Sequence, residues 1–213
     1  SFFIAASSAL FAQVNIQPGT RVTIQPGAYM VLQGNLTSGM TIFGSGTVVM
    51  KGTIAQNLNT NGSIIPNLRI DNPAHVNLTG NVRIGNSLNF VNGKLRLGNS
   101  TLILNPNIPI TGFTTTRFIE TNGAGRVNKL VTSNLANAIV PIGFGNNYNP
   151  VALTTSGTYV SASISLSSRG VAHPNKPVGA THYLNTYWTI ARAGISGNVT
   201  AAATYANANI VGT

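Results

Sequence analysis

The sequence predicts an all-β protein built from a β-solenoid followed by a β-sandwich. Three observations support this prediction. Short alternating strands recur at nearly constant spacing over residues 14–106, longer alternating segments follow over residues 107–213, and no amphipathic helical period is found in the chain. The expected strands end at Gly, Pro or Asn, which favour turns. We therefore expect an apolar segment (1–13), a solenoid (14–106) and a sandwich (107–213).

Two internal repeats indicate the solenoid. Val14–Gly19 (VNIQPG) returns eight residues later as Val22–Gly27 (VTIQPG), and each copy is a short strand closed by a Pro-Gly turn. A second repeat has an apolar-Arg-apolar triplet with spacings of fourteen and thirteen residues: Leu68–Asn72, Val82–Asn86 and Leu95–Asn99. Such repeats are typical of a parallel β-helix, whose aliphatic residues stack inward. A β-meander is the alternative, because hairpins would give the same spacing.

The arginines of the second repeat are candidate contacts for a polyanion. In a β-helix with this period, Arg69, Arg83 and Arg96 would line up on one outer face. Stacked like charges repel unless they are solvated or matched by an anion.

The second half of the chain has the pattern of a sandwich. Seven alternating segments are separated by turn signals such as Asn122-Gly123. They comprise Thr115–Thr121, Arg126–Thr132, Ala138–Phe144, Val151–Thr155, Tyr159–Ser165, Tyr183–Ala191 and Val199–Ala206. We place the boundary between solenoid and sandwich at residues 106–114. Within the sandwich Trp188 is expected in the core, and Tyr183 and Tyr187 on the opposite face are candidate glycan contacts.

The charge composition predicts weak attraction to polyanions. Twelve Lys and Arg stand against two acidic residues, which gives a formal net charge of +10, but the cations are evenly spread without a run. That distribution argues against a specific nucleic-acid site and favours a diffuse field. Anionic polysaccharide or lipopolysaccharide is the partner that this field suits.

The residue inventory points away from catalysis. The only acids are Asp71 and Glu120, and the chain has no cysteine. The histidines His75, His173 and His182 lack the close spacing of metal ligands. We therefore expect no enzyme activity, no cofactor and no metal. A carbohydrate-active enzyme, the least favoured alternative, would have to bring the two carboxylates together.

The first twelve residues, SFFIAASSALFA, form an apolar segment too short to span a bilayer. One interpretation is the remnant of an export signal. The other is a retained strand, buried either in the core of its own domain or, by strand addition, in a groove of a neighbouring subunit. In the case of strand addition the anchors at the polymerisation interface would be Phe2, Phe3, Ile4, Leu10 and Phe11.

Four motifs give a family resemblance: LFAQ (10–13), GRVNK (125–129), VPIGFGNNYNPV (140–151) and YWTI (187–190). With the Gly-Asn-rich repeats, they resemble secreted surface proteins of Bacteroidota. Many of these are adhesin-like or matrix proteins, often exported by the type IX route with a separate C-terminal sorting domain, which is not visible here. The resemblance implies secretion and a place at the cell surface or in the extracellular matrix, and it brings no catalytic residues.

These observations favour a structural subunit of an extracellular filament, sheath or matrix, a homopolymer assembled by β-strand addition of residues 1–13. The alternative is a monomeric adhesin module that binds glycan or another polyanion. No transmembrane span is expected.

Overall fold

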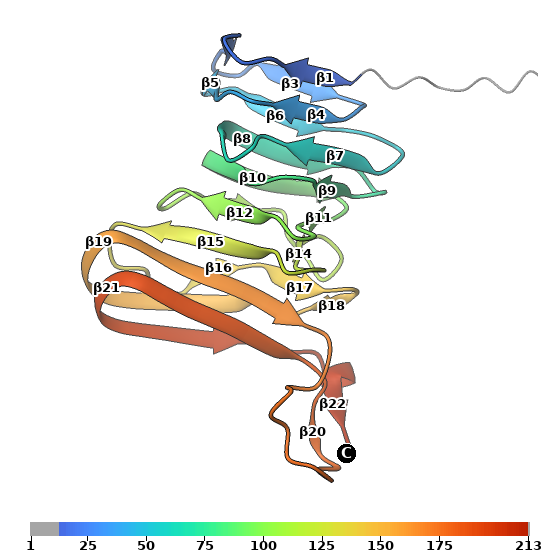
Figure 1. Cartoon of the computed structure of the whole chain (residues 1–213), viewed down its shortest axis with the longest axis vertical. Helices are drawn as coiled ribbons and strands as arrows, with labels where there is room; N and C mark the ends of the chain where they lie inside the picture. Colours follow the sequence, from blue (N-terminus) through green and yellow to red (C-terminus); the bar gives the residue numbers. More distant parts are fainter. Residues whose placement is uncertain (1–12, 213) are drawn as a thin grey trace, which may run out of the picture.

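The structure is a computed structural model that describes residues 13–212, and it is a β-solenoid of about six turns (Figure 1). The coils stack from the blue N-terminal end to the red C-terminal end. Among the described residues the only helix is the short 3₁₀ turn η1 (Asn207–Asn209). The all-β and solenoid predictions are confirmed. No helix in this part of the chain has the length and apolarity needed to cross a membrane.

One side of the coil is an eight-stranded sheet in which all neighbours are parallel except the last pair. Its strands are β1 (Val14–Ile16), β4 (Leu36–Ser38), β7 (Gln56–Asn59), β9 (Val76–Leu78), β11 (Leu95–Arg96), β14 (Ile119–Glu120), β17 (Ile142–Phe144) and β18 (Asn147–Tyr148). From β1 to β17, successive strands begin 19 to 24 residues apart, which is the true period of the coil.

The facing side is a larger sheet. Its strands are β3 (Tyr29–Leu32), β6 (Thr47–Met50), β8 (Ile64–Asp71), β10 (Val82–Asn92), β12 (Thr101–Leu104), β15 (Arg126–Val131), β19 (Val151–Arg169) and β16 (Ala138–Val140), with β13 (Ile110–Thr111) beside β10 and β21 (Tyr187–Ala203) beside β19. Two short pairs complete the fold: β2 (Val22–Ile24) with β5 (Ile42–Gly44), and β20 (Tyr183–Leu184) with β22 (Ile210–Val211).

Aliphatic side chains stack in register inside the coil. On the first sheet Val76, Leu95, Ile119 and Ile142 occupy one row, and all four are fully buried. The strand alternation places the next residues, Asn77, Arg96 and Glu120, in the adjacent row. Because each coil covers the apolar row of the coil before it, the core runs the length of the solenoid.

Asparagine side chains link successive coils at the corners. Oδ1 of Asn35 accepts a hydrogen bond from the backbone N–H of Asn57 at 2.8 Å, and Oδ1 of Asn81 accepts from Thr101 at the same distance. Oδ1 of Asn99 likewise accepts from Ala124 at 3.1 Å. At a corner the strand ladder is interrupted, so these side chains satisfy backbone donors that would otherwise lack a protein partner.

The predicted repeat of thirteen to fourteen residues is not the coil period. Leu68 on β8 pairs with Leu88 rather than Val82, and Leu95 lies on the other sheet. The reason is the length of β8 and β10, which have eight and eleven residues. The apolar-Arg-apolar triplets therefore fall at different points around the coil.

The predicted sandwich is also corrected. Parallel pairing continues past residue 106, since β12 pairs with β15 and β14 pairs with β17. Only afterwards does the chain turn antiparallel, where β19 pairs with β15, β16 and β21. Within residues 13–212 the second half thus extends the solenoid and its single core, and no separate sandwich is formed. The predicted N-terminal strand and its anchors Phe2, Phe3, Ile4, Leu10 and Phe11 lie outside the described residues.

Candidate functional site

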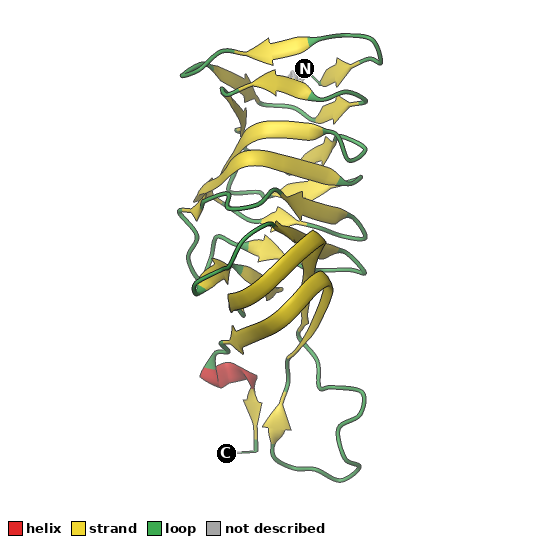
Figure 2. Cartoon of the chain, turned by 90° about the vertical axis from the view of Figure 1, so that its left-hand side faces the viewer, coloured by secondary structure: helices red, strands yellow, loops and turns green. Residues whose placement is uncertain are grey.

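The C-terminal end of the solenoid is formed by a long bent hairpin of β19 and β21. The second half of β19 pairs with β15, and its first half pairs with β16. The hairpin therefore folds around the end of the coil, as the orange and red ribbons of Figure 1 show. Figure 2 shows the same two ribbons side by side across the lower part of the molecule.

Glycines allow the two strands to bend together. Gly157 and Gly197 lie opposite each other at φ values of 140° and 139°. A Cβ atom on Gly157 would lie 2.1 Å from the carbonyl oxygen of Ser196, which is closer than contact allows. The register between β19 and β21 also shifts between Tyr159 and Ser163. The bend thus needs residues without a side chain at the point of closest approach.

Strand β21 is an open edge. It has seventeen residues and, within residues 13–212, it pairs with β19 alone. Natural edge strands are commonly protected by charges, by proline or by shortness. This strand is long, contains no proline, and carries one charged residue, Arg192. Its free backbone groups form a template onto which another strand can be added.

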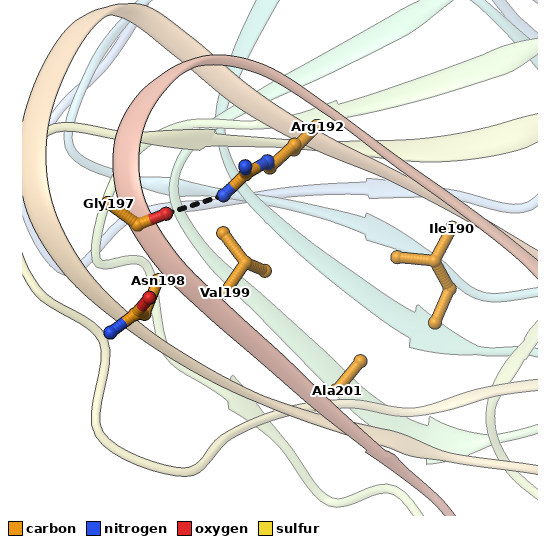
Figure 3. Close-up of a pocket in the computed structure, with 6 residues that line it drawn as sticks. All are labelled: Ile190, Arg192, Gly197, Asn198, Val199 and Ala201. Carbon is orange, nitrogen blue, oxygen red and sulfur yellow. Dashed lines mark hydrogen bonds between the residues drawn. The ribbon is translucent and has the colours of Figure 1, made fainter.

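The inner face of β21 is the open end of the core. Ile190 is in register with buried Leu166, and Ala201 is in register with buried Leu153. Ile190 and Arg192 on one arm of the bend, and Asn198, Val199 and Ala201 on the other, line a cavity of about 420 Å³ (Figure 3). At its mouth Nη1 of Arg192 donates a hydrogen bond to the Gly197 carbonyl at 2.6 Å. The cavity therefore has both apolar and polar walls, with a single fixed cation.

The three candidate arginines do not form a stacked row. Arg69 lies between Val49 and Asn89 in its sheet, whereas Arg83 lies between Ile64 and Ile103. Arg96 belongs to the opposite sheet.

Two of these arginines are paired with the two acids of the chain. Nη2 of Arg69 lies 3.3 Å from Oδ2 of Asp71, and Nε of Arg96 lies 2.7 Å from Oε2 of Glu120. The acids thus act as partners of the arginines and are held at different sides of the coil. The structure does not bring Asp71 and Glu120 together as a carboxylate pair.

The candidate tyrosines already have protein partners. Nζ of Lys176 lies 4.7 Å from the ring centroid of Tyr183, and the His173 ring meets Tyr187 edge-on at 5.0 Å. Trp188 packs against the core, and its Nε1 donates a hydrogen bond to the Asn149 carbonyl. Among the described residues no His, Asp and Glu side chains gather in a group of three that could hold a metal ion.

A buried lysine, which sequence reasoning missed, ties the coil to the turn after β17. Nζ of Lys94 donates hydrogen bonds to the Gly145 carbonyl and to Oδ1 of Asn146, and it lies 4.8 Å from the ring centroid of Phe118. Burial lowers the pKa of Lys94, and the nearby Glu120 carboxylate opposes that effect. The only sequence signal is a lysine directly before the buried Leu95, a position usually held by a solvated residue.

Comparison with protein-family models, curated proteins and solved structures gave no match.

Proposed function

We propose that the protein is a structural subunit of an extracellular filament, sheath or matrix, assembled by β-strand addition of residues 1–13 into a neighbouring subunit. Strand β21 is the acceptor. The observation that supports this proposal is the long edge of β21, unpaired within residues 13–212, beside an open cavity that includes Ile190, Val199 and Ala201 in its lining. The proposal assigns no catalytic role, and the Bacteroidota resemblance adds secretion to the cell surface as part of it.

The chemistry of donor and acceptor is complementary. The donor residues are apolar and uncharged, and Phe2, Phe3, Ile4, Leu10 and Phe11 supply large anchors. Main-chain hydrogen bonds to β21 would give register, and an anchor in the cavity beside Ile190 would remove apolar surface from water.

The proposed contact is heterologous, because the donor and acceptor are different surfaces of one chain. Such a contact repeats from copy to copy and generates an open polymer rather than a closed dimer.

The test is negative-stain electron microscopy of the 213-residue chain, a form lacking residues 1–13, and two acceptor variants. Val199→Lys and Ala201→Lys each place a charge in the cavity, whereas Ala191→Lys places the same charge on the other face of β21. We expect filaments with the full chain and with Ala191→Lys only. Filaments that persist without residues 1–13, or that tolerate both acceptor variants, would overturn the proposal.

The alternative function is a monomeric adhesin module that binds glycan or another polyanion. The observation in its favour is that both acidic side chains are already paired, so most of the positive charge is left uncompensated. Salt-sensitive binding that survives the loss of residues 1–13 would support this function over the filament.

A further inference from the structure

A trough with polar and apolar parts runs along one corner of the solenoid, where the chain passes from the larger sheet to the eight-stranded sheet. Pro73, His75, Asn92 and the loop 114–117 line a cavity of about 640 Å³. A second cavity of about 300 Å³ shares Pro73 and Asn92 and continues past Asp71 to Lys51. The lining residues come from successive coils, so the trough is parallel to the solenoid axis. Each cavity has the size of a site for a small ligand.

One end of the trough holds a cation in a fixed position. Nη1 of Arg117 donates a hydrogen bond to the Val91 carbonyl at 2.7 Å, and its Nε donates to Oγ1 of Thr114 at 3.3 Å. A guanidinium group has five N–H donors, so others remain for a ligand. The two acidic side chains of the protein are paired with Arg69 and Arg96, and neither neutralises Arg117. This end of the trough therefore suits an anion.

His75 adds a neutral donor beside this cation. Its Nδ1 accepts a hydrogen bond from the backbone N–H of Lys94 at 3.1 Å, which places the ring proton on Nε2. Burial, followed by the charges of Arg96 and Lys94, lowers the pKa of His75 against the opposing charge of Glu120, which favours the neutral ring. The described residues provide no hydrogen-bond partner for Nε2, and its N–H is left for a ligand.

The trough also offers acceptors and hydroxyl groups. Oδ1 of Asp71 accepts a hydrogen bond from Nδ2 of Asn92 at 2.7 Å, which leaves the side-chain oxygen Oδ1 of Asn92 for a donor. Thr115 and Thr116 are exposed at the edge. Mixed donors and acceptors along a trough match the hydroxyl groups of a sugar chain. The spacing between coils is about 4.8 Å, close to the length of one pyranose unit in an extended chain.

We propose that this corner trough binds an extended acidic oligosaccharide. Arg117 and His75 hold a carboxylate or sulfate group, while Asn92 and Asp71 hydrogen-bond the hydroxyl groups of adjacent sugars. Ligand binding in the trough does not require filament assembly, because none of the residues that line it belongs to β21.

The test is isothermal titration calorimetry of the 213-residue chain with three probes: a galacturonate hexamer, a heparin hexasaccharide and neutral maltohexaose. We expect binding of at least one acidic probe and none of maltohexaose. A preference between the acidic probes distinguishes a carboxylate from a sulfate ligand, and either supports the site. Binding of neither acidic probe, or equal binding of all three, overturns it.

Matched variants locate the binding. Arg117→Gln should weaken binding by at least about tenfold, because a charge-assisted contact is lost. Arg126→Gln removes the same charge from an exposed position on β15 and should change affinity by less than about twofold. An equal loss of affinity in both variants would mean that net charge alone causes the binding, and it would overturn the site.

A third variant covers any effect of Arg117→Gln on folding. Thr115→Trp fills the trough from an exposed position and removes no charge and no hydrogen bond that the structure gives. It should abolish binding while the circular dichroism spectrum and the melting temperature stay unchanged. Full binding by a folded Thr115→Trp protein would also overturn the site.

Discussion

The parallel coils and the terminal hairpin use the same inward-facing rows but differ in whether anything covers them. In the coils, Leu95 and Ile119 are 0% exposed, because a neighbouring coil lies on each side. In β21, Ile190 occupies the corresponding face and is 37% exposed. A solenoid coil is thus buried by its neighbours and not by itself. The last strand of the stack leaves a surface that can receive another chain.

Truncation of an inward-facing aliphatic side chain to alanine should lower the free energy of unfolding more in a coil than in β21. Leu95→Ala should lower the free energy of unfolding by about 3 kcal/mol, because it leaves a cavity between packed coils. Ile190→Ala should lower it by less than about 1 kcal/mol, since that side chain is already partly in water. Urea denaturation followed by circular dichroism measures both values. Equal losses would mean that the cavity beside β21 is closed in solution.

The bend of the hairpin can be tested at its glycine pair. Gly157→Ala should lower the free energy of unfolding by about 2 kcal/mol, because a Cβ there meets the Ser196 carbonyl oxygen at a φ that L-residues avoid. Gly145→Ala is the control, since its φ is also positive but a Cβ meets no atom within 4 Å. Its loss should be smaller, at about 1 kcal/mol. Similar losses would argue that backbone strain alone, without the close approach, sets the cost.

The smallest change in the free energy of unfolding is expected at Lys129, and here the substitution should stabilise the fold. This lysine lies on the core-facing side of β15 between Leu104 and Ile164, and it is nearly fully buried. Lys129→Met keeps the approximate volume and removes the buried charge, so the free energy of unfolding should rise by about 1 kcal/mol. A decrease would show that the ammonium group stabilises the fold.

The pH dependence gives an independent check on Lys129. Burial lowers the pKa of this lysine below its ordinary value of 10.5. Between the folded-state pKa and 10.5 the unfolded chain therefore binds more protons, and stability attributable to this group rises with pH. The difference in the free energy of unfolding between Lys129→Met and the wild-type protein should accordingly become smaller as the pH approaches 10.5. A constant difference would contradict the proposed cause.

The sequence was sufficient to predict strands and coils, because alternating Val, Ile and Leu with Gly and Asn corners is a local signal. It was insufficient for the coil period, since the triplets around Arg69 and Arg83 lie on long strands and mimic a shorter repeat. The longer alternating segments after residue 107 suggested a sandwich, yet Ile119 and Ile142 continue the inner row of the coils. Pairing partners distant in sequence decide that choice, and alternation does not reveal them.

Surface sites were predicted less well than the fold. The predicted row of Arg69, Arg83 and Arg96 was wrong because it assumed a coil period of thirteen to fourteen residues. The corner trough was not predicted, because its residues are far apart in sequence. His75 is unusual in the structure, because it adopts a φ of 75° at a corner where Gly or Asn would be expected. The sequence alone does not show that a corner falls at this residue. Arg117 offered no sequence signal either, since its neighbours in the trough are set by the stacking of coils.

The asparagine corners have a mechanical consequence. The ladder hydrogen bonds and the asparagine side chains both join one coil to the next along the solenoid axis, so under tension along that axis the links act in series. We expect the coils to peel from an end one at a time. Each event would release 19 to 24 residues, a gain in contour length of roughly 70 Å. Under such tension the protein should lengthen in nearly equal steps and dissipate mechanical energy at each step.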